Sequence, residues 1–463
     1  MRIHFIAIGG SAMHNLAIAL KQKGYSITGS DDEIFEPSRS RLASHGLLPE
    51  EIGWFPDKIS QQLDAVVLGM HARADNPELL RAKELGVTIY SYPEYLYEQT
   101  KSKTRVVIGG SHGKTTITSM VMHVLRSVGL EFDYMVGAQI EGFENMVGLS
   151  EESTIAVFEG DEYLTSPIDP RPKFHLYRPH IAVISGIAWD HVNVFPTFDI
   201  YRKQFEQFVQ TIEPNGHLIY CASDTVVCQV VKDAPQSVAR FDYLAHPSRI
   251  NLEKTCLITD SGDVELKIFG HHNMENISAA KEVCRILGVE DADFYWALST
   301  FNGAAKRLQL VKSAETTDVF LDFAHAPSKV VATVNAVRNA YPFRKLVACL
   351  ELHTFSSLNP SFLDQYSGSL NRADQPIVFF NPKTLEHKKL PPLTPQVIQS
   401  CFNSKNLLVF TDSLELSKFL KSQFWDNTNL LLMSSGNFSG LDTSALAEEI
   451  TDDDQFPRRY LDV

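Results

Sequence analysis

The sequence lacks the long apolar run that a membrane-spanning helix needs. No stretch of its 463 residues reaches the ~18 apolar residues of such a span. The chain also enters a strand at Ile3 without the basic and apolar regions of a signal peptide. Basic residues are outnumbered by acidic ones, which gives a net charge of −14. This charge argues against nucleic acid or an anionic membrane as the main partner. We therefore expect a cytoplasmic protein that binds neither nucleic acid nor a membrane.

Cysteine pairs are also missing. None of the 6 cysteines stands in a Cys-x-x-Cys pair, so the sequence indicates neither a zinc knuckle nor a disulfide framework. Apolar residues, in contrast, make up 44% of the chain, which is ample for several cores. The length favours about three domains, and strands alternating with helices predict an α/β fold.

A glycine-rich loop between a strand and a helix is the strongest local signal. Val106 to Ile108 predict a buried strand, and a helix with apolar residues at helical spacing follows from Lys114. Backbone N–H groups at such a helix start favour phosphates, a Lys reaches the outer phosphates, and a Thr hydroxyl binds Mg²⁺. The predicted triphosphate-binding residues are Gly110, Ser111, His112, Gly113, Lys114, Thr115 and Thr116. The full P-loop pattern has Gly where this chain has Ile108, so an ordinary glycine-rich turn is the alternative.

The N-terminus has a second glycine turn. Strand, Gly9-Gly10-Ser11-Ala12 and helix are followed by a strand that ends in Gly29-Ser30-Asp31. This is a dinucleotide-type βαβ start, in which an acidic residue after the second strand meets a ribose or a base. The full Gly-x-Gly-x-x-Gly is absent, so a tight turn without a ligand is the alternative. His71 follows the strand at 65–69, at the edge where open α/β sheets bind ligands.

Two polar groups follow further predicted strands. Glu159 ends the strand at 154–158, and His191 comes shortly after the strand at 181–184. If both strands lie parallel to the P-loop strand, these side chains emerge beside Lys114 and Thr115 and can hold Mg²⁺. An imidazole is a less usual Mg²⁺ ligand. The alternative is that Glu159 caps a strand end and His191 is a loop histidine.

Three later segments are predicted as follows. The basic, proline-rich segment 168–179 is not a regular helix, and contacts substrate or serves as a solvated connector. The polar residues 270–276 precede a helix at 277–287 and contact a purine or a metal, or cap that helix. A third α/β unit starts near Leu308, and the acidic tail after Glu449 is exposed.

The order of these motifs resembles the Mur ligase family of peptidoglycan synthesis. The series runs from Gly-Ser-Asp through Gly-Lys-Thr-Thr, Glu-x-Asp-Glu and Asp-His to Gly-x-His-Asn-x-x-Asn, Arg-Leu and Asp-x-Ala-His-x-Pro. The resemblance covers nearly the whole chain. It implies three α/β domains: a Rossmann-like UDP-sugar domain at 1–102, a P-loop ATPase domain at 103–307, and a Rossmann-like closing domain at 308–463 that brings the amine substrate.

The resemblance also implies roles for residues. Lys114, Glu159 and His191 would be catalytic, and Thr115, Glu159 and His191 would hold Mg²⁺. Asn276 would contact adenine, with Arg307 and Asp322 contacting nucleotide. The expected UDP-sugar contacts are Gly9, Gly10, Ser11, Ala12, Met13, Ser30, Asp31 and His71, and the expected peptide contacts are His353, Thr354, Ser356 and Asn437.

Within the family, two features resemble the murein peptide ligase branch. These are the insert Asp169-Pro-Arg-Pro-Lys-Phe and the segment Leu350-Glu-Leu-His-Thr-Phe-Ser356. The resemblance implies ATP- and Mg²⁺-dependent joining of UDP-N-acetylmuramate to L-Ala-γ-D-Glu-meso-diaminopimelate through an acyl phosphate, in peptidoglycan recycling, by a monomer or weak homodimer. The alternatives are a UDP-N-acetylmuramate–L-alanine ligase, an NAD-dependent oxidoreductase based on the N-terminal turn, and a non-catalytic ATP-binding protein.

Overall fold

The structure, a computed structural model, describes residues 1–251 and 254–452. The chain divides into two compact units. The first consists of Met1–Trp189, Thr197–Leu244 and Glu275–Leu298, and the second of Asp190–Pro196, Ala245–Met274 and the chain from Ser299 onward. Among the described residues, no helix combines the length and the apolar character needed to cross a membrane.

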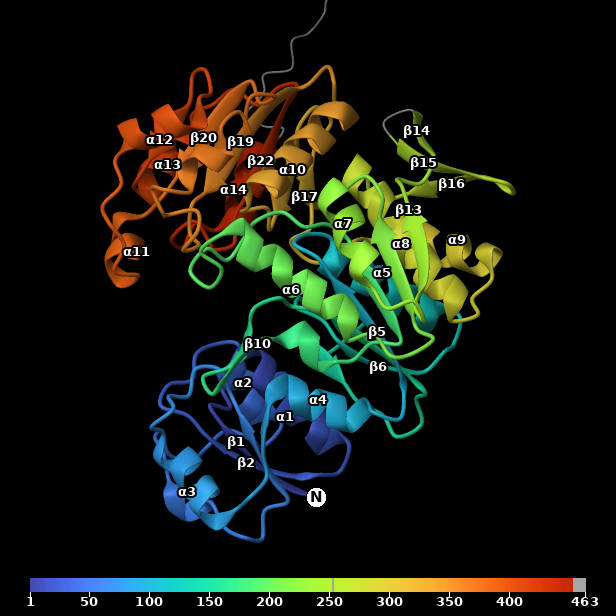
Figure 1. Cartoon of the computed structure of the whole chain (residues 1–463). Helices are drawn as coiled ribbons and strands as arrows, with labels where there is room; N and C mark the ends of the chain where they lie inside the picture. Colours follow the sequence, from blue (N-terminus) through green and yellow to red (C-terminus); the bar gives the residue numbers. More distant parts are fainter. Residues whose placement is uncertain (252–253, 453–463) are drawn as a thin grey trace, which may run out of the picture. The chain divides into compact units, whose positions relative to one another are not determined.

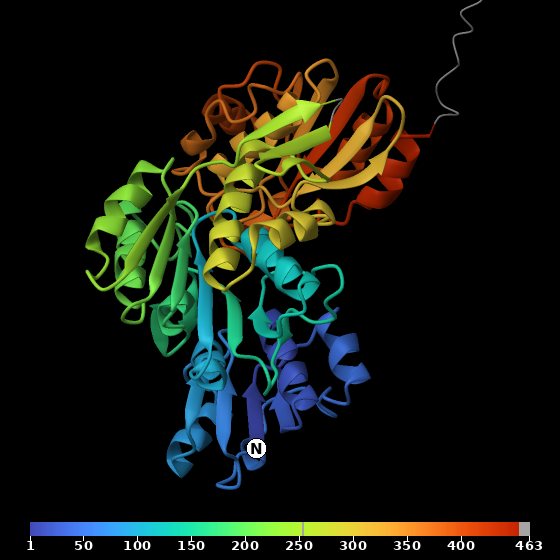
Figure 2. The ribbon, with the colours of Figure 1, turned by 90° about the vertical axis from the view of Figure 1, so that its right-hand side faces the viewer.

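The first unit opens with a parallel four-stranded sheet in the order β2-β1-β3-β4. Its strands are β1 (Arg2–Ile6), β2 (Ser26–Ser30), β3 (Ala65–Leu68) and β4 (Ile89–Ser91), and its helices are α1 (Ser11–Gln22), α2 (Ser38–Ser44), α3 (Pro77–Leu85) and α4 (Tyr92–Thr100), with a 3-10 turn at Pro56–Lys58. Helices lie on both faces of this sheet (Figure 2). The central strand β3 is therefore entirely apolar and buried.

A seven-stranded sheet in the order β13-β12-β11-β5-β8-β6-β7 forms the rest of the first unit (Figure 1). Its strands are β5 (Thr104–Gly109), β6 (Phe132–Met135), β7 (Val147–Gly148), β8 (Ile155–Glu159), β11 (Ile181–Ile184), β12 (His217–Cys221) and β13 (Ala239–Tyr243). Strand β5 lies between β11 and β8 and runs parallel to both. The predicted parallel arrangement around the P-loop strand is thus confirmed.

Helices and a small hairpin accompany this sheet. They are α5 (Lys114–Ser127), α6 (Phe198–Gln210), α7 (Thr225–Val230), α8 (His271–Ile286) and α9 (Asp291–Ser299), with the antiparallel pair β9 (Leu164–Ser166) and β10 (Asp169–Pro172), and 3-10 turns at Lys173–Leu176 and Val231–Asp233.

The second unit contains two sheets. The smaller is antiparallel, with β14 (Ser248–Asn251), β15 (Lys254–Thr259) and β16 (Gly262–Leu266). The larger has the order β17-β18-β22-β19-β20-β21 and comprises β17 (Gln309–Ser313), β18 (Asp318–Asp322), β19 (Lys345–Glu351), β20 (Gln375–Phe379), β21 (Leu408–Phe410) and β22 (Thr428–Met433). Its helices are α10 (Pro327–Ala340), α11 (Pro382–His387), α12 (Pro395–Phe402), α13 (Ser413–Lys421) and α14 (Thr443–Ile450), with a 3-10 turn at Leu363–Tyr366. All its strands pair in parallel except the edge strand β17.

The structure corrects two sequence predictions. Helix α8 begins at His271, not at 277, because the polar residues fit a first helical turn, where Asn273 donates to the Phe269 carbonyl. The segment 168–179 avoids α-helix as predicted, but it is no solvated connector. It forms β10 and a 3-10 turn, and Phe174 within the turn and Tyr177 directly after it are fully buried. Most of the acidic tail, residues 453–463, lies outside the described residues.

Candidate active site

The glycine loop between β5 and α5 is shaped by contacts that leave no room for side chains. Gly110 has a φ of +137°, and a Cβ at this position would overlap the Ser185 hydroxyl. Ser111 donates its N–H to the Gly186 carbonyl at 2.9 Å, and its hydroxyl accepts from Ala188 N at 2.9 Å. Ile108, where the P-loop pattern has Gly, is a buried strand residue paired with the neighbouring strands. The strand therefore continues through Gly109, and the loop begins at Gly110.

The start of α5 is suited to an anion. Its N-cap is Gly113, with a φ of +77°, and in the described part of the chain no side chain caps this helix. Some other helices carry side-chain caps, such as Asn76 on α3 and Asp224 on α7, whereas α1, α2 and α10 also lack one. The N–H groups in the first turn of an uncapped helix, together with the helix dipole, favour a phosphate.

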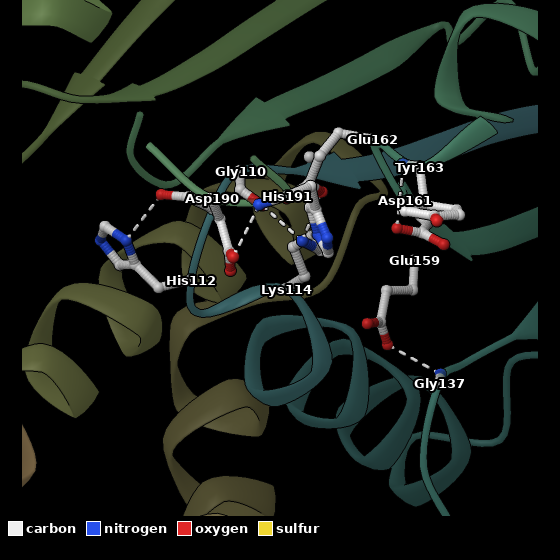
Figure 3. A network of polar contacts seen from close by, with 12 residues as sticks. Gly110, His112, Lys114, Gly137, Glu159, Asp161, Glu162, Tyr163, Asp190 and His191 are labelled. Carbon is white, nitrogen blue, oxygen red and sulfur yellow. Dashed lines mark hydrogen bonds and ion pairs between the residues drawn. The ribbon is translucent and has the colours of Figure 1, made fainter. Parts of the chain in front are cut away.

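Lys114, the first residue of α5, points its ammonium back to the loop (Figure 3). Its Nζ donates to the Gly110 carbonyl at 2.6 Å and to Glu162 Oε2 at 2.6 Å. Burial alone would lower the pKa of Lys114, but the carboxylates of Glu162 and Asp161 raise it above its ordinary value. Lys114 is therefore a cation throughout the neutral range, placed where outer phosphates would lie.

Glu159 and Thr115 form the predicted pair beside this lysine. The Thr115 hydroxyl donates to Glu159 Oε1 at 3.0 Å, and Gly137 N donates to Oε2 at 2.8 Å. Figure 3 shows the second of these bonds at the end of β8. A hydroxyl and a carboxylate in contact are the hard oxygen donors that Mg²⁺ takes in proteins, so these two residues fit the ion.

His191 lies in the second unit, beside Asp190. Its backbone has a φ of +54°. Asp190 is buried, with its Oδ2 3.6 Å from His325 Nε2 and 3.7 Å from Lys329 Nζ. Burial alone would raise the pKa of Asp190, but the hydrogen bond from His325 and the charge of Lys329 hold it well below its ordinary range. The predicted sharing of a metal between His191 and Glu159 stays a prediction.

The three other predicted nucleotide contacts differ in their surroundings. A Cβ on Gly113 would lie 2.5 Å from Asn276 Oδ1, so Asn276 lies against the glycine loop, and its contact with a nucleotide stays a prediction. Asp322 accepts from Leu308 N at 3.0 Å and from the Thr333 hydroxyl. Arg307 lies 4.7 Å from the centre of the Phe323 ring. Both oxygens of Asp322 thus serve the second unit itself, and the nucleotide roles of Asp322 and Arg307 stay predictions.

The N-terminal turn is closed by its own carboxylate. Gly9 N donates to Asp31 Oδ2 at 2.6 Å, and a Cβ on Gly9 would lie 2.9 Å from that oxygen. Burial raises the pKa of Asp31, while N–H bonds from Gly9 and Glu33 lower it less. The predicted UDP-sugar residues follow the carboxyl ends of β1, β2 and β3: Ser11, Ala12 and His71 are exposed, Gly9 and Gly10 are half-buried, and Met13, Ser30 and Asp31 are buried.

The predicted peptide contacts follow β19 and β22 in the second unit. Ser356 accepts from Val192 N at 3.2 Å, and Thr354 bonds to Ser357 within a turn. His353 is half-exposed, with its Nδ1 3.8 Å from Glu351 Oε1. Asn437 is exposed and accepts from Gly440 N at 3.2 Å. Their contact with a peptide stays a prediction.

Sequence reasoning assigned no role to three residues that organise these sites. Glu162 binds Lys114, and its Oε1 accepts from the Tyr201 hydroxyl at 2.9 Å. Glu351 is 2% exposed and accepts from Phe438 N at 2.8 Å and from the Ser434 hydroxyl. The Glu-x-Asp-Glu motif contains Glu162 and was the one available signal, whereas Tyr201 lies on the buried face of an amphipathic helix and Glu351 ends an apolar strand.

The fold and the site define a nucleotide-binding α/β protein with a P-loop, and comparison with known proteins gives its family. The model described as "Mur ligase family, catalytic domain" matches residues 2–104, and "Mur ligase middle domain" matches residues 108–284. The chain belongs to the Mur ligase family, whose members are ATP-dependent ligases that form amide bonds. The family expected from the sequence is confirmed.

Relatives with two different substrate names are similar to this chain. The UDP-N-acetylmuramate–L-alanine ligase of Carboxydothermus hydrogenoformans is 28% identical, over 95% of both chains. The UDP-N-acetylmuramate–L-alanyl-γ-D-glutamyl-meso-2,6-diaminoheptandioate ligase of Escherichia coli is also 28% identical, over 95% of this chain and 96% of its own. The crystal structure of a murein peptide ligase from Psychrobacter arcticus superimposes with a TM-score of 0.67 at 22% identity, covering 98% and 99% of the two chains. The three-domain α/β fold class is thereby confirmed.

Proposed function

We propose that the protein joins UDP-N-acetylmuramate to L-Ala-γ-D-Glu-meso-diaminopimelate at the expense of ATP. The observation that carries the ATP site is the glycine loop with its uncapped helix and buried Lys114. The N-terminal turn, with Asp31 at the carboxyl edge of its sheet, suits a UDP-sugar. Cell-wall recycling in the cytoplasm is the setting that this reaction would have.

The residues of the site suit phosphoryl transfer. The lactyl carboxylate of the sugar attacks the γ-phosphate and gives an acyl phosphate and ADP, and the peptide amine then displaces phosphate. Lys114 neutralises charge on the transferred group, and the backbone of residues 110–116 holds the phosphates in line. A Mg²⁺ on Thr115 and Glu159 would supply further charge neutralisation. Such a reaction needs positioned charges more than a protein nucleophile.

The choice of a peptide acceptor rests on the insert at 169–174. This segment is tied to the rest of the first unit, because Lys173 Nζ pairs with Asp161 Oδ2 at 2.6 Å and Arg171 Nη2 lies 3.6 Å from Glu94 Oε1. It returns the chain to the stretch that follows Glu159. A larger acceptor is expected to need such additional ordered surface near the reacting groups. The E. coli relative acts on this peptide by name.

The second candidate is the L-alanine-adding ligase, which the relative from C. hydrogenoformans favours. The two candidates share the sugar substrate, ATP and the acyl phosphate, and differ only in the amine. Because the chain belongs to a family of ligases, an NAD-dependent oxidoreductase and a non-catalytic ATP-binding protein are excluded as alternatives.

Phosphate release tests this proposal. The purified protein is incubated with ATP, Mg²⁺ and UDP-N-acetylmuramate, and with L-alanine, L-alanyl-γ-D-glutamate or the tripeptide as acceptor. We expect release that requires the UDP-sugar and is fastest with the tripeptide. Release with L-alanine alone would support the second candidate, and release independent of the UDP-sugar would contradict both.

A further inference from the structure

The chain itself holds the Lys114 ammonium from two sides. A lysine ammonium has three N–H donors and accepts no hydrogen bond. One donor is used by the Gly110 carbonyl and one by Glu162 Oε2, each at 2.6 Å. One donor is left for a ligand, and the other two bonds fix its direction. A freely rotating ammonium would lack this direction.

The carboxylate that makes the second bond is itself fixed. Glu162 is 1% exposed, and its other oxygen accepts from the Tyr201 hydroxyl at 2.9 Å. Tyr201 is fully buried in α6, with its ring edge-on to Phe205 at 5.3 Å between centroids. A buried carboxylate persists only with fixed partners. Tyr201 of α6 therefore fixes the Glu162 carboxylate, and Glu162 in turn fixes the position of the Lys114 ammonium.

We propose that Glu162 is a positioning residue for phosphoryl transfer, and that Tyr201 supports it by fixing its carboxylate. The pair aims the remaining N–H of Lys114 at a terminal oxygen of a nucleoside triphosphate. This inference rests on the proposed contact between Lys114 and the phosphates, and it adds two residues that touch no nucleotide.

The negative charge of Glu162 distinguishes a positioning role from a role in nucleotide binding. Glu162 is an anion beside the place of a polyphosphate, so its charge opposes nucleotide binding. Its loss should leave nucleotide affinity intact or slightly higher. A donor aimed in advance acts mainly where charge develops in the transition state, so loss of the aim should lower kcat. A purely structural role would weaken binding and activity together.

The variants are Glu162→Gln, Glu162→Asp and Tyr201→Phe, with Tyr177→Phe as the matched control. The Tyr177 hydroxyl is also buried in this unit but has no hydrogen-bond partner among the described residues. Glu213→Gln is the control for loss of a carboxylate, because Glu213 pairs with Arg105 and Arg178 instead of the loop. Each variant is assayed for kcat and for the KM of ATP. Calorimetry gives its Kd for a non-hydrolysable ATP analogue.

We expect kcat to fall about 100-fold in Glu162→Gln, since small misplacements of a positioned group have effects of that order. Tyr201→Phe should lose about tenfold, as expected for one hydrogen bond to a charged group. Glu162→Asp should lie between Glu162→Gln and the wild type. In all three the Kd of the analogue should stay within about threefold of wild type, because the lost groups touch no nucleotide. The two controls should match the wild type.

Two results would overturn the inference. One is a kcat in Glu162→Gln and Tyr201→Phe equal to that of Tyr177→Phe. The other is a rise in Kd that accounts for the whole loss of kcat/KM. Lys114→Ala separates this failure from failure of the proposed ATP site. If Lys114→Ala is inactive while Glu162→Gln is normal, only the positioning role fails, whereas an active Lys114→Ala contradicts the ATP site itself.

Discussion

The first unit contains two glycine turns with the same order of elements, and they differ in what fills them. Each follows a buried parallel strand and leads into a helix that no described side chain caps. The turn after β1 is filled by Asp31, an acceptor from its own sheet. The loop after β5 is filled by Lys114, a donor. From this difference we expect the first turn to receive hydrogen-bond donors such as ribose or base groups, and the second to receive phosphate.

Lys114→Ala should have the largest effect. It removes the cation of the second loop, and we expect kcat to fall about a thousandfold, as for the loss of a main transition-state donor. The fold should persist with a lower free energy of unfolding, because alanine is favourable in helices but the buried Glu162 loses its cationic partner. Steady-state kinetics and circular dichroism measure the two effects. Near-normal turnover would contradict the proposal that the loop after β5 binds phosphate.

Gly110→Ala should follow. Its φ of +137° and the adjacent Ser185 hydroxyl both exclude a Cβ, and such backbone strain costs about 1–3 kcal/mol. We expect kcat/KM for ATP to fall about 100-fold through displacement of the loop, with a smaller effect on the KM of the UDP-sugar. An unchanged KM and kcat for ATP would show that the loop tolerates a side chain.

Gly9→Ala is the matching change in the first turn. A Cβ there would lie 2.9 Å from Asp31 Oδ2 and 2.9 Å from an Ile34 carbon, so Asp31 must shift. We expect the KM of the UDP-sugar to rise about tenfold, the effect of one charged hydrogen bond, with the KM of ATP unchanged. A larger effect on ATP than on the UDP-sugar would reverse the assignment of the two turns.

The effect of Asp31→Asn on stability should be the smallest of the effects considered, and it appears in the pH dependence of the free energy of unfolding. Burial raises the pKa of Asp31 in the folded protein, so the folded state binds more protons than the unfolded state between the unfolded and folded pKa values. This carboxyl therefore lowers the free energy of unfolding as the pH rises through that window. We expect the stability of wild type relative to Asp31→Asn to decline from acidic to neutral pH in thermal melts. A relative gain over the same range would contradict a raised pKa.

The strands, the loop and the positions at the sheet edges could be predicted from the sequence, because each depends on local spacing. Ile108 and its neighbours read as a buried strand, and Glu159 was placed beside Thr115 by assuming parallel pairing, which the register confirms. The start of α8 was wrong because polar residues before an apolar face do not show where a helix begins. The helix that contains Asn276 therefore begins six residues earlier than predicted.

Partners that come from distant elements could not be predicted. Tyr201 is 39 positions from Glu162, and its place in an apolar helix face resembles that of any core tyrosine. Asp322 shows the same dependence. The family resemblance implied a nucleotide contact, which stays a prediction, and only the structure shows that its oxygens accept from Leu308 and Thr333. Position at a sheet edge is local information, whereas the remaining hydrogen-bonding capacity of a side chain depends on the tertiary fold.

The most direct test of the central claim is a competition between acceptors. The protein is given ATP, Mg²⁺ and UDP-N-acetylmuramate with equal concentrations of L-alanine and L-Ala-γ-D-Glu-meso-diaminopimelate, and mass spectrometry identifies the UDP-sugar products. We expect the UDP-sugar tripeptide to form almost alone, with ADP in equal amount. A product that carries only L-alanine would contradict it.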